Sequence, residues 1–80
     1  MAPEVEEVLR RGVVRLKILS PTQKKVVLLA VVGEMSKSEI ATKLGKSFHT
    51  IDTHFRKLYL KLGVHSLDQL IEKVAEAGQR

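Results

Sequence analysis

The sequence predicts an all-α domain of four helices that follows a short N-terminal extension. Three observations support this. Apolar residues recur at every third or fourth place and nowhere alternate as they do in a strand. A serine stands before each of the four apolar stretches, and a glycine follows each of them. We therefore expect helices near residues 21–32, 37–44, 48–62 and 67–77.

The serines are suited to accept a hydrogen bond from a free N–H group in the first turn of a helix. Three of them have glutamine or glutamate three places later, which is the spacing of a capping box: Ser20 with Gln23, Ser36 with Glu39, and Ser66 with Gln69. Ser47 is a fourth N-cap, with Thr50 in the place of the longer partner. The four helices are expected to end at glycines in the left-handed conformation: Gly33, Gly45, Gly63 and Gly78.

The four apolar stripes predict one shared core. Only Gly45, Lys46 and Ser47 separate the helix over 37–44 from the helix over 48–62. Two helices joined so tightly, with a glycine in the turn, form a helix-turn-helix. An ordinary corner of a helical bundle is the alternative that this spacing leaves open.

Residues 1–18 form the N-terminal extension, and residues 19–80 form the predicted helix-turn-helix domain. Within the extension, Glu4 to Arg11 has the composition for a helical turn or two. The pattern from Val13 to Ile18 leaves two possibilities open, which are packing on the core and a strand-like arm.

The charge of the chain suggests a polyanionic partner. The chain has 80 residues, no cysteine, a formal net charge of +5 and a pI near 9.8. The excess of positive charge lies in residues 36–64, where six lysines and arginines stand against two acids. Nucleic acid is the first expectation and an acidic membrane surface the second. There is no apolar run of spanning length and no secretory signal pattern, so we expect a cytoplasmic protein.

Several motifs together resemble the LuxR/GerE-type DNA-binding domain of bacterial transcription regulators. They are Leu19-Ser20-Pro21 opening a helix, SKSEIA from Ser36, TIDTH from Thr50 and KLGV from Lys61, and the resemblance covers about residues 19–77. It implies a four-helix domain that binds double-stranded DNA and places the helix over 48–62 in the major groove. It also implies a homodimer through the helix over 67–77, where Val74, Ala75 and Gly78 could leave a strip of small residues for a partner helix. RNA polymerase is a further possible partner, and such a regulator acts on the bacterial nucleoid.

The resemblance also implies which residues contact DNA. The places that reach bases fall on Asp52, Thr53 and Arg56, which a helical wheel puts opposite the apolar stripe. The places that contact phosphates fall on Lys37, Ser47, Thr50, Lys57 and Lys61. Asp52 departs from the family, which usually has lysine there. It could accept a hydrogen bond from a cytosine amino group or pair with Arg56 one turn later, and we expect altered base preference or weaker affinity.

Two rival functions stay open on the sequence. Asp52, together with the apolar Phe48 and Leu60 at places that are commonly polar, favours a protein-binding adaptor with little DNA affinity. It would dock on RNA polymerase, a sigma factor or another regulator. A terminal region of a sigma factor is a weaker rival, because the KLGV motif and the fourth helix argue against it.

The chemistry of the side chains gives no sign of a catalytic or metal site. His49, His54 and His65 have no converging cysteine or acid cluster, so no metal is predicted. His49 and Asp52 lack an accompanying nucleophile or glycine-rich phosphate loop. We therefore expect neither enzymatic activity nor a cofactor.

Overall fold

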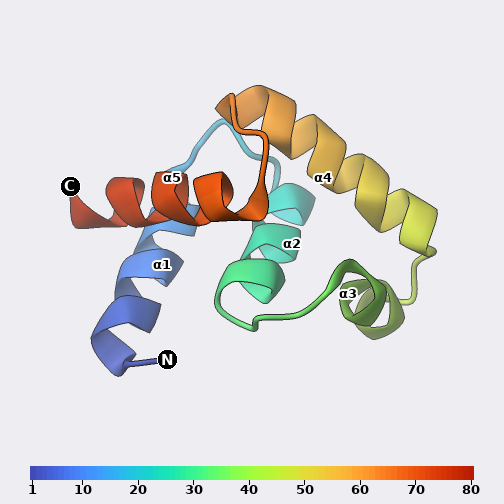
Figure 1. Cartoon of the computed structure of the whole chain (residues 1–80), viewed down its shortest axis with the longest axis horizontal. Helices are drawn as coiled ribbons and strands as arrows, with labels where there is room; N and C mark the ends of the chain where they lie inside the picture. Colours follow the sequence, from blue (N-terminus) through green and yellow to red (C-terminus); the bar gives the residue numbers. More distant parts are fainter.

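The computed structural model describes all residues, 1–80, and is entirely helical (Figure 1). Its elements are α1 (Pro3–Arg15), α2 (Pro21–Val31), α3 (Lys37–Leu44), α4 (Phe48–Leu62) and α5 (Leu67–Gln79). The predicted all-α class is confirmed, and the four predicted helices correspond to α2–α5 with ends that agree within two residues. The N-terminal extension supplies a fifth helix, which is longer than the helical turn or two predicted for Glu4 to Arg11. Val13 packs on the core, which was one of the two possibilities for that segment, and no strand-like arm forms.

The predicted caps form at the start of every helix from α2 to α5. Ser20 and Ser36 each make both hydrogen bonds of a capping box. Ser47 accepts from the backbone N–H of Thr50 at 3.1 Å. The third predicted box is only half formed, because the side chain of Gln69 accepts from the backbone N–H of His65 instead of Ser66. The caps therefore set the helix starts at the places predicted from the sequence.

Two of the four predicted glycine stops were wrong. Gly45 and Gly63 do take left-handed conformations, with φ of 66° and 68°. After α2 the positive φ belongs to Glu34, at 54°, and Gly33 keeps an ordinary conformation. Gly78 lies inside α5, which continues to residue 79. Its lack of a side chain serves helix packing instead of a turn.

One hydrophobic core joins all five helices. Its largest fully buried side chains are Ile40, Ile51, Leu58, Leu70, Val26, Val27 and Val74. Leu9 and Val13 of α1 belong to the same cluster. Each buried side chain of this size contributes about 1.5–3 kcal/mol relative to an exposed one, so α1 is a part of the fold and not an appendage.

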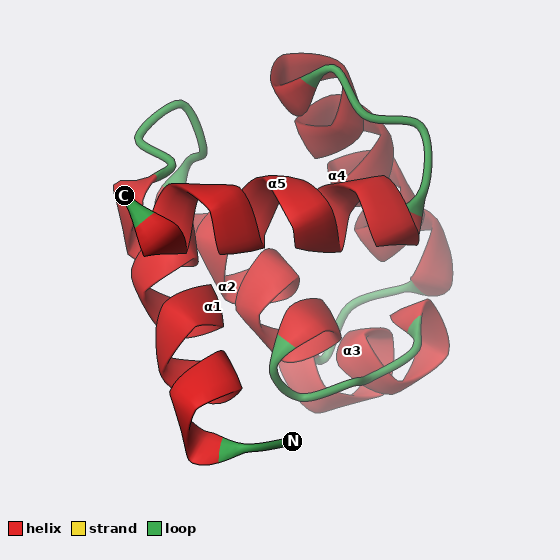
Figure 2. Ribbon diagram, turned by 60° about the vertical axis from the view of Figure 1, so that its left-hand side comes forward, coloured by secondary structure: helices red, strands yellow, loops and turns green.

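The helices α1 and α5 cross in close contact (Figures 1 and 2). A side chain on Gly12 would collide with the carbonyl of Val74, and one on Gly78 would collide with the carbonyl of Val8. The two glycines thus let the backbones approach in an antiparallel pair of contacts. The small-residue strip expected to receive a partner helix is therefore covered at Val74 and Gly78 by α1 of the same chain, while Ala75 stays half-buried.

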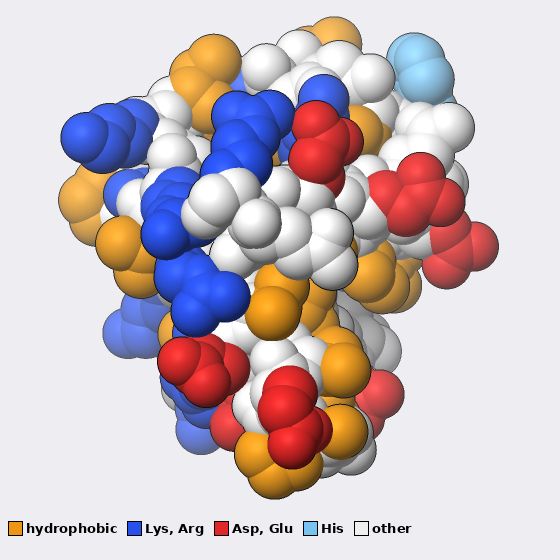
Figure 3. All heavy atoms as spheres, turned by 90° about the vertical axis from the view of Figure 1, so that its left-hand side faces the viewer, with side chains coloured by type: hydrophobic (Ala, Val, Ile, Leu, Met, Phe, Trp, Pro, Cys, Tyr) orange, Lys and Arg blue, Asp and Glu red, His pale blue; other side chains and the backbone are white.

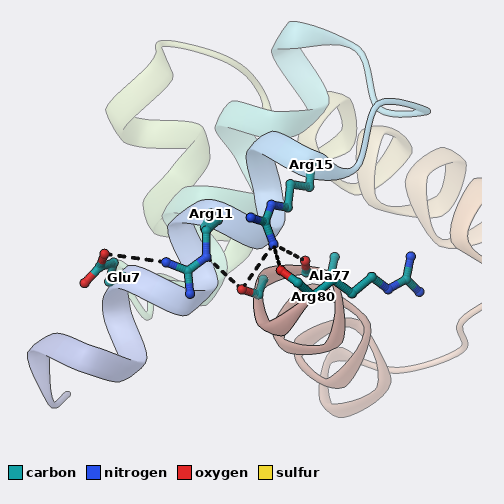
Figure 4. Close-up of polar contacts among 6 residues, drawn as sticks. Glu7, Arg11, Arg15, Ala77 and Arg80 are labelled. Carbon is teal, nitrogen blue, oxygen red and sulfur yellow. Dashed lines mark hydrogen bonds and ion pairs between the residues drawn. The ribbon is translucent and has the colours of Figure 1, made fainter.

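Two arginines of α1 bind the free carbonyl groups at the end of α5 (Figure 4). Arg11 donates from Nε to the carbonyl of Gly78 at 2.7 Å, and Arg15 donates to the carbonyl of Ala77 at 3.2 Å and to that of Arg80. Cations at a helix C-terminus also interact favourably with the helix dipole. These bonds fix where α1 sits along α5.

Substituting Gly12 or Gly78 with alanine tests this crossing. In an exposed helix, glycine to alanine stabilises by about 1 kcal/mol. Here we expect the opposite sign, a destabilisation of about 1–3 kcal/mol, because the added methyl group overpacks the crossing. Urea unfolding of Gly12→Ala and Gly78→Ala measures it. Stabilisation by either change would show that the helices do not touch in solution.

Candidate nucleic-acid interface

The corner between α3 and α4 holds the two helices in a helix-turn-helix arrangement. Gly45 ends α3 in the left-handed conformation, and the N–H of Lys46 bonds back to the carbonyl of Ala41 at 2.9 Å. Ser47 then caps α4, and its hydroxyl also lies 2.9 Å from that of Thr50. The corner is therefore closed by backbone and cap bonds, and α4 leaves it along the outside of the molecule (Figure 1).

Burial of one stripe sets the rotation of α4 about its own axis. Ile51, Phe55 and Leu58 are almost completely buried. The opposite side carries His49 and Arg56 exposed, with Asp52 and Thr53 half-buried. This is the face that the helical wheel predicted to point away from the core.

Asp52 makes two ion pairs, one that joins α4 to α3 and one within α4. Its Oδ1 lies 2.7 Å from Nζ of Lys37, and its Oδ2 lies 3.0 Å from Nε of Arg56. The side chain of Asp52 is 19% exposed, whereas that of Arg56 is 78% exposed. Nζ of Lys37 also lies 5.5 Å from the ring centre of Phe55, within the range of a cation–π contact. We refer to Lys37, Asp52 and Arg56 as the Asp52 cluster.

The electrostatics of the site follow from these contacts. The hydrogen bond from Lys37 lowers the pKa of Asp52, and the charges of Lys37 and Arg56 act in the same direction, while desolvation opposes them. The pKa of Glu39 is also lowered, because the backbone and side chain of Ser36 bond to it. Desolvation raises the pKa of Tyr59, whose ring packs edge-on against Phe55. Asp52 is thus held as a carboxylate at neutral pH.

The remaining predicted site residues fall into two places. Thr50 and Lys57 lie on α4 and Ser47 caps its start, with Ser47 and Lys57 exposed. Lys61 is directed elsewhere, because its ammonium group donates to Oε1 of Gln23 at 2.8 Å and to the carbonyl of Ile18 at 3.4 Å. It therefore binds the start of α2 instead of extending the exposed face.

Two further residues belong to this surface and were not among the predicted contacts. Lys46 in the corner and His49 in the first turn of α4 are both exposed beside Ser47. Their position in the sequence, next to the start of a helix, could have predicted a phosphate contact, because free N–H groups and nearby cations together attract anions.

Basic residues on the side formed by α1 are largely engaged within the protein. Figure 3 shows that side, where basic and acidic side chains lie close to one another. Arg10 pairs with Glu6 and Arg11 with Glu7, each one turn apart at 3.5 Å. On α4 and its corner, Lys46 and Lys57 are exposed and make no hydrogen bond or ion pair within the protein, so both are available to a polyanion.

The side chains converge on no other recognisable chemistry. No group of three or more histidine or acidic side chains lies close enough together to hold a metal ion. None of the five helices combines the length and apolar character that crossing a membrane requires.

The pH dependence of stability tests the Asp52 cluster. A lowered pKa in the folded state contributes stability above the ordinary value of 3.8, and this contribution is lost as the pH falls through the folded value. We expect Asp52→Asn to lower the free energy of unfolding at pH 7, and the difference from wild type to shrink below pH 3.8. Urea unfolding across pH measures this, with Glu72→Gln as a control for the loss of one charge. A difference that is independent of pH would assign the loss to packing.

The family and the relatives of the chain agree with this geometry. The sequence model of the family described as bacterial regulatory proteins, luxR family, matches residues 17–74. Proteins named as candidate HTH-type transcriptional regulators in Mycobacterium bovis and in two strains of Mycobacterium tuberculosis are 40% identical over 60 residues. The match covers 75% of this chain and only 7% of each relative's length. No solved structure matches the chain significantly. Because the matched segment contains α2 to α4 and most of α5, the chain belongs to the luxR family of bacterial regulatory proteins.

Proposed function

We propose that the chain is a sequence-specific, double-stranded DNA-binding domain of a transcription regulator that reads the major groove with α4. The observation that carries the proposal is the outward face of α4, where Arg56 is 78% exposed beside half-buried Asp52 and Thr53. The major groove admits a helix, and an arginine can bind both acceptors of a guanine edge. The names of the relatives support a regulatory role, which is exerted on the chromosome in the cytoplasm.

Phosphate contacts would hold α4 in the groove. Ser47 and Thr50 stand at the N-terminus of α4, where free N–H groups attract a phosphate. Lys57 extends from the next turns, and Lys37 approaches from the start of α3. Lys61 contributes least, since its ammonium group is bound to Gln23.

We also propose that the domain pairs with a second copy through α5. With Val74 and Gly78 covered by α1, the available stripe of α5 consists of Leu67, Ile71 and Ala75. Leu67 is 46% exposed. Together with Ile71 it lines an apolar groove completed by Met1 and Val5 of the N-terminal segment. A dimer of this kind would place one copy of α4 on each of two half-sites in the DNA.

The adaptor hypothesis draws on exposed apolar side chains of α4. Leu60 is 83% exposed on α4, and Phe48 is 53% exposed at its start. The two side chains stand near opposite ends of α4, so each would be a separate apolar contact for a partner protein. An absence of DNA binding at low salt, with recovery of an RNA polymerase subunit, would favour this function over the first.

DNA binding is tested by titrating the chain into a fluorescently labelled random duplex pool at several salt concentrations. We expect log K to fall linearly and steeply with log salt, because several phosphates are neutralised. The duplexes that bind best are then selected from the pool.

Two substitutions separate base contacts from phosphate contacts on the selected duplex. Arg56→Ala should cost about 1–3 kcal/mol and relax specificity at one position, whereas Lys57→Ala should weaken all sequences alike and flatten the salt slope by about one. Lys73→Ala on α5 is the matched control for the loss of one positive charge, and it should change neither the base specificity nor the salt slope. An equal loss on every sequence for Arg56→Ala would remove it from the base contacts.

Self-association is tested by sedimentation equilibrium with and without DNA. Leu67→Lys should weaken the dimer, because it places a charge in the apolar stripe of α5. Val14→Lys is the control, since Val14 is equally apolar, 67% exposed and outside that stripe. A dimer that is unaffected by Leu67→Lys would place the contact elsewhere.

A further inference from the structure

Asp52 is the one acid on α4, and it stands in the middle of the face proposed to meet DNA. A carboxylate near phosphates weakens binding by repulsion. Both of its oxygens, however, are already engaged by cations within the protein, Oδ1 by Lys37 and Oδ2 by Arg56. Its side chain is only 19% exposed, so it lies beneath the more exposed guanidinium group of Arg56.

The geometry at Arg56 leaves the groups that read a base unoccupied. The contact of Asp52 with Arg56 is made at Nε, and the two terminal nitrogens of Arg56 donate no hydrogen bond within the protein. Those two nitrogens can form a parallel pair of bonds to O6 and N7 of guanine. A long arginine side chain that is already held at Nε loses less conformational freedom when it binds.

Lys37 supplies the anchor for this arrangement. It comes from α3 and holds Oδ1 of Asp52 at 2.7 Å, while also lying over the ring of the buried Phe55. The carboxylate is therefore fixed relative to the core and not only to its own helix.

We infer that Asp52 is a positioning residue for base discrimination, which rests on the DNA-binding function proposed above. It holds the guanidinium group of Arg56 with its two terminal nitrogens directed away from the protein. This raises the preference for guanine at the position Arg56 reads and lowers the affinity for DNA in general. Lys37 is then first an anchor of Asp52 and only second a phosphate contact.

The test compares wild type, Asp52→Asn, Arg56→Ala and the double variant on three probes. The probes are the duplex selected from the random pool by the wild type, the same duplex with one base pair changed at the position that Arg56→Ala relaxes, and the unselected pool. Anisotropy titrations across salt give the affinity ratio between the first two probes. Circular dichroism melting confirms that each variant is folded.

We expect Asp52→Asn to bind the unselected pool more tightly and to steepen its salt slope by up to about one, because a negative charge is lost and Lys37 is freed for a phosphate. The ratio of the affinity for the selected duplex to the affinity for the duplex with one base pair changed should fall by about tenfold. A change of this size is within the discrimination that one bidentate base contact provides. In the Arg56→Ala background, Asp52→Asn should leave that ratio unchanged, since no guanidinium group remains to be held. Glu72→Gln, which removes an exposed charge from α5, should not alter the ratio in either background.

Lys37→Gln provides a second route to the same conclusion. It keeps Asp52 but removes its anchor on α3, so the ratio should again fall while binding to the pool does not tighten. Retention of the full ratio in Asp52→Asn would overturn the positioning role, as would an equal fall in the Arg56→Ala background. A wild-type chain that fails to bind the pool at low salt would instead overturn the proposed function, and the role of Asp52 with it.

Discussion

The burial of Ile51, Phe55 and Leu58 is the interaction on which the rest of this structure depends. These side chains attach α4 to the core shared by the other four helices. A helix held by such a stripe cannot rotate about its axis without exposing apolar area worth about 25 cal/mol per Å². The direction of every polar side chain on the opposite face of α4 follows from it. The candidate interface is thus set by the core and not by contacts on the surface.

The rest of the fold serves to hold that helix in place. The left-handed Gly45 and the cap at Ser47 fix the angle at which α4 leaves α3. On the far side, the close crossing at Gly12 and Gly78 holds α1 against α5. Arg11 and Arg15 donate hydrogen bonds to the free carbonyl groups at the end of α5. Part of the positive charge of the chain is therefore engaged inside the fold. Lys46 in the corner and Lys57 on α4 are exposed and make no such contact.

The Asp52 cluster explains a residue that the sequence alone made puzzling. An acid in the centre of a basic helix is unfavourable for DNA if it is free, but here it is bound on both oxygens. The pairing with Arg56 one turn later was one of the two roles that spacing suggested, and the structure shows it. The participation of Lys37 was not foreseen, because it depends on the packing of α3 against α4 and lies 15 residues away in the chain. Lys61 was assigned to the DNA face by resemblance, yet it reaches the start of α2.

By itself, the sequence determined the elements that rest on local chemistry. Serines at helix starts, the two left-handed glycines at 45 and 63, and the helical period of the apolar residues each act within a few residues, so the amino-acid order alone was enough to place α2–α5. Tertiary structure alone decided that the N-terminal helix extends to residue 15 against α5, that Gly78 meets Val8 across a crossing instead of ending a helix, and that Lys37 joins Arg56 at Asp52. The physical reason is that these features need partners distant in the chain. Whether a glycine ends a helix or admits a neighbour, and whether a lysine is free or paired, depends on which backbone arrives beside it.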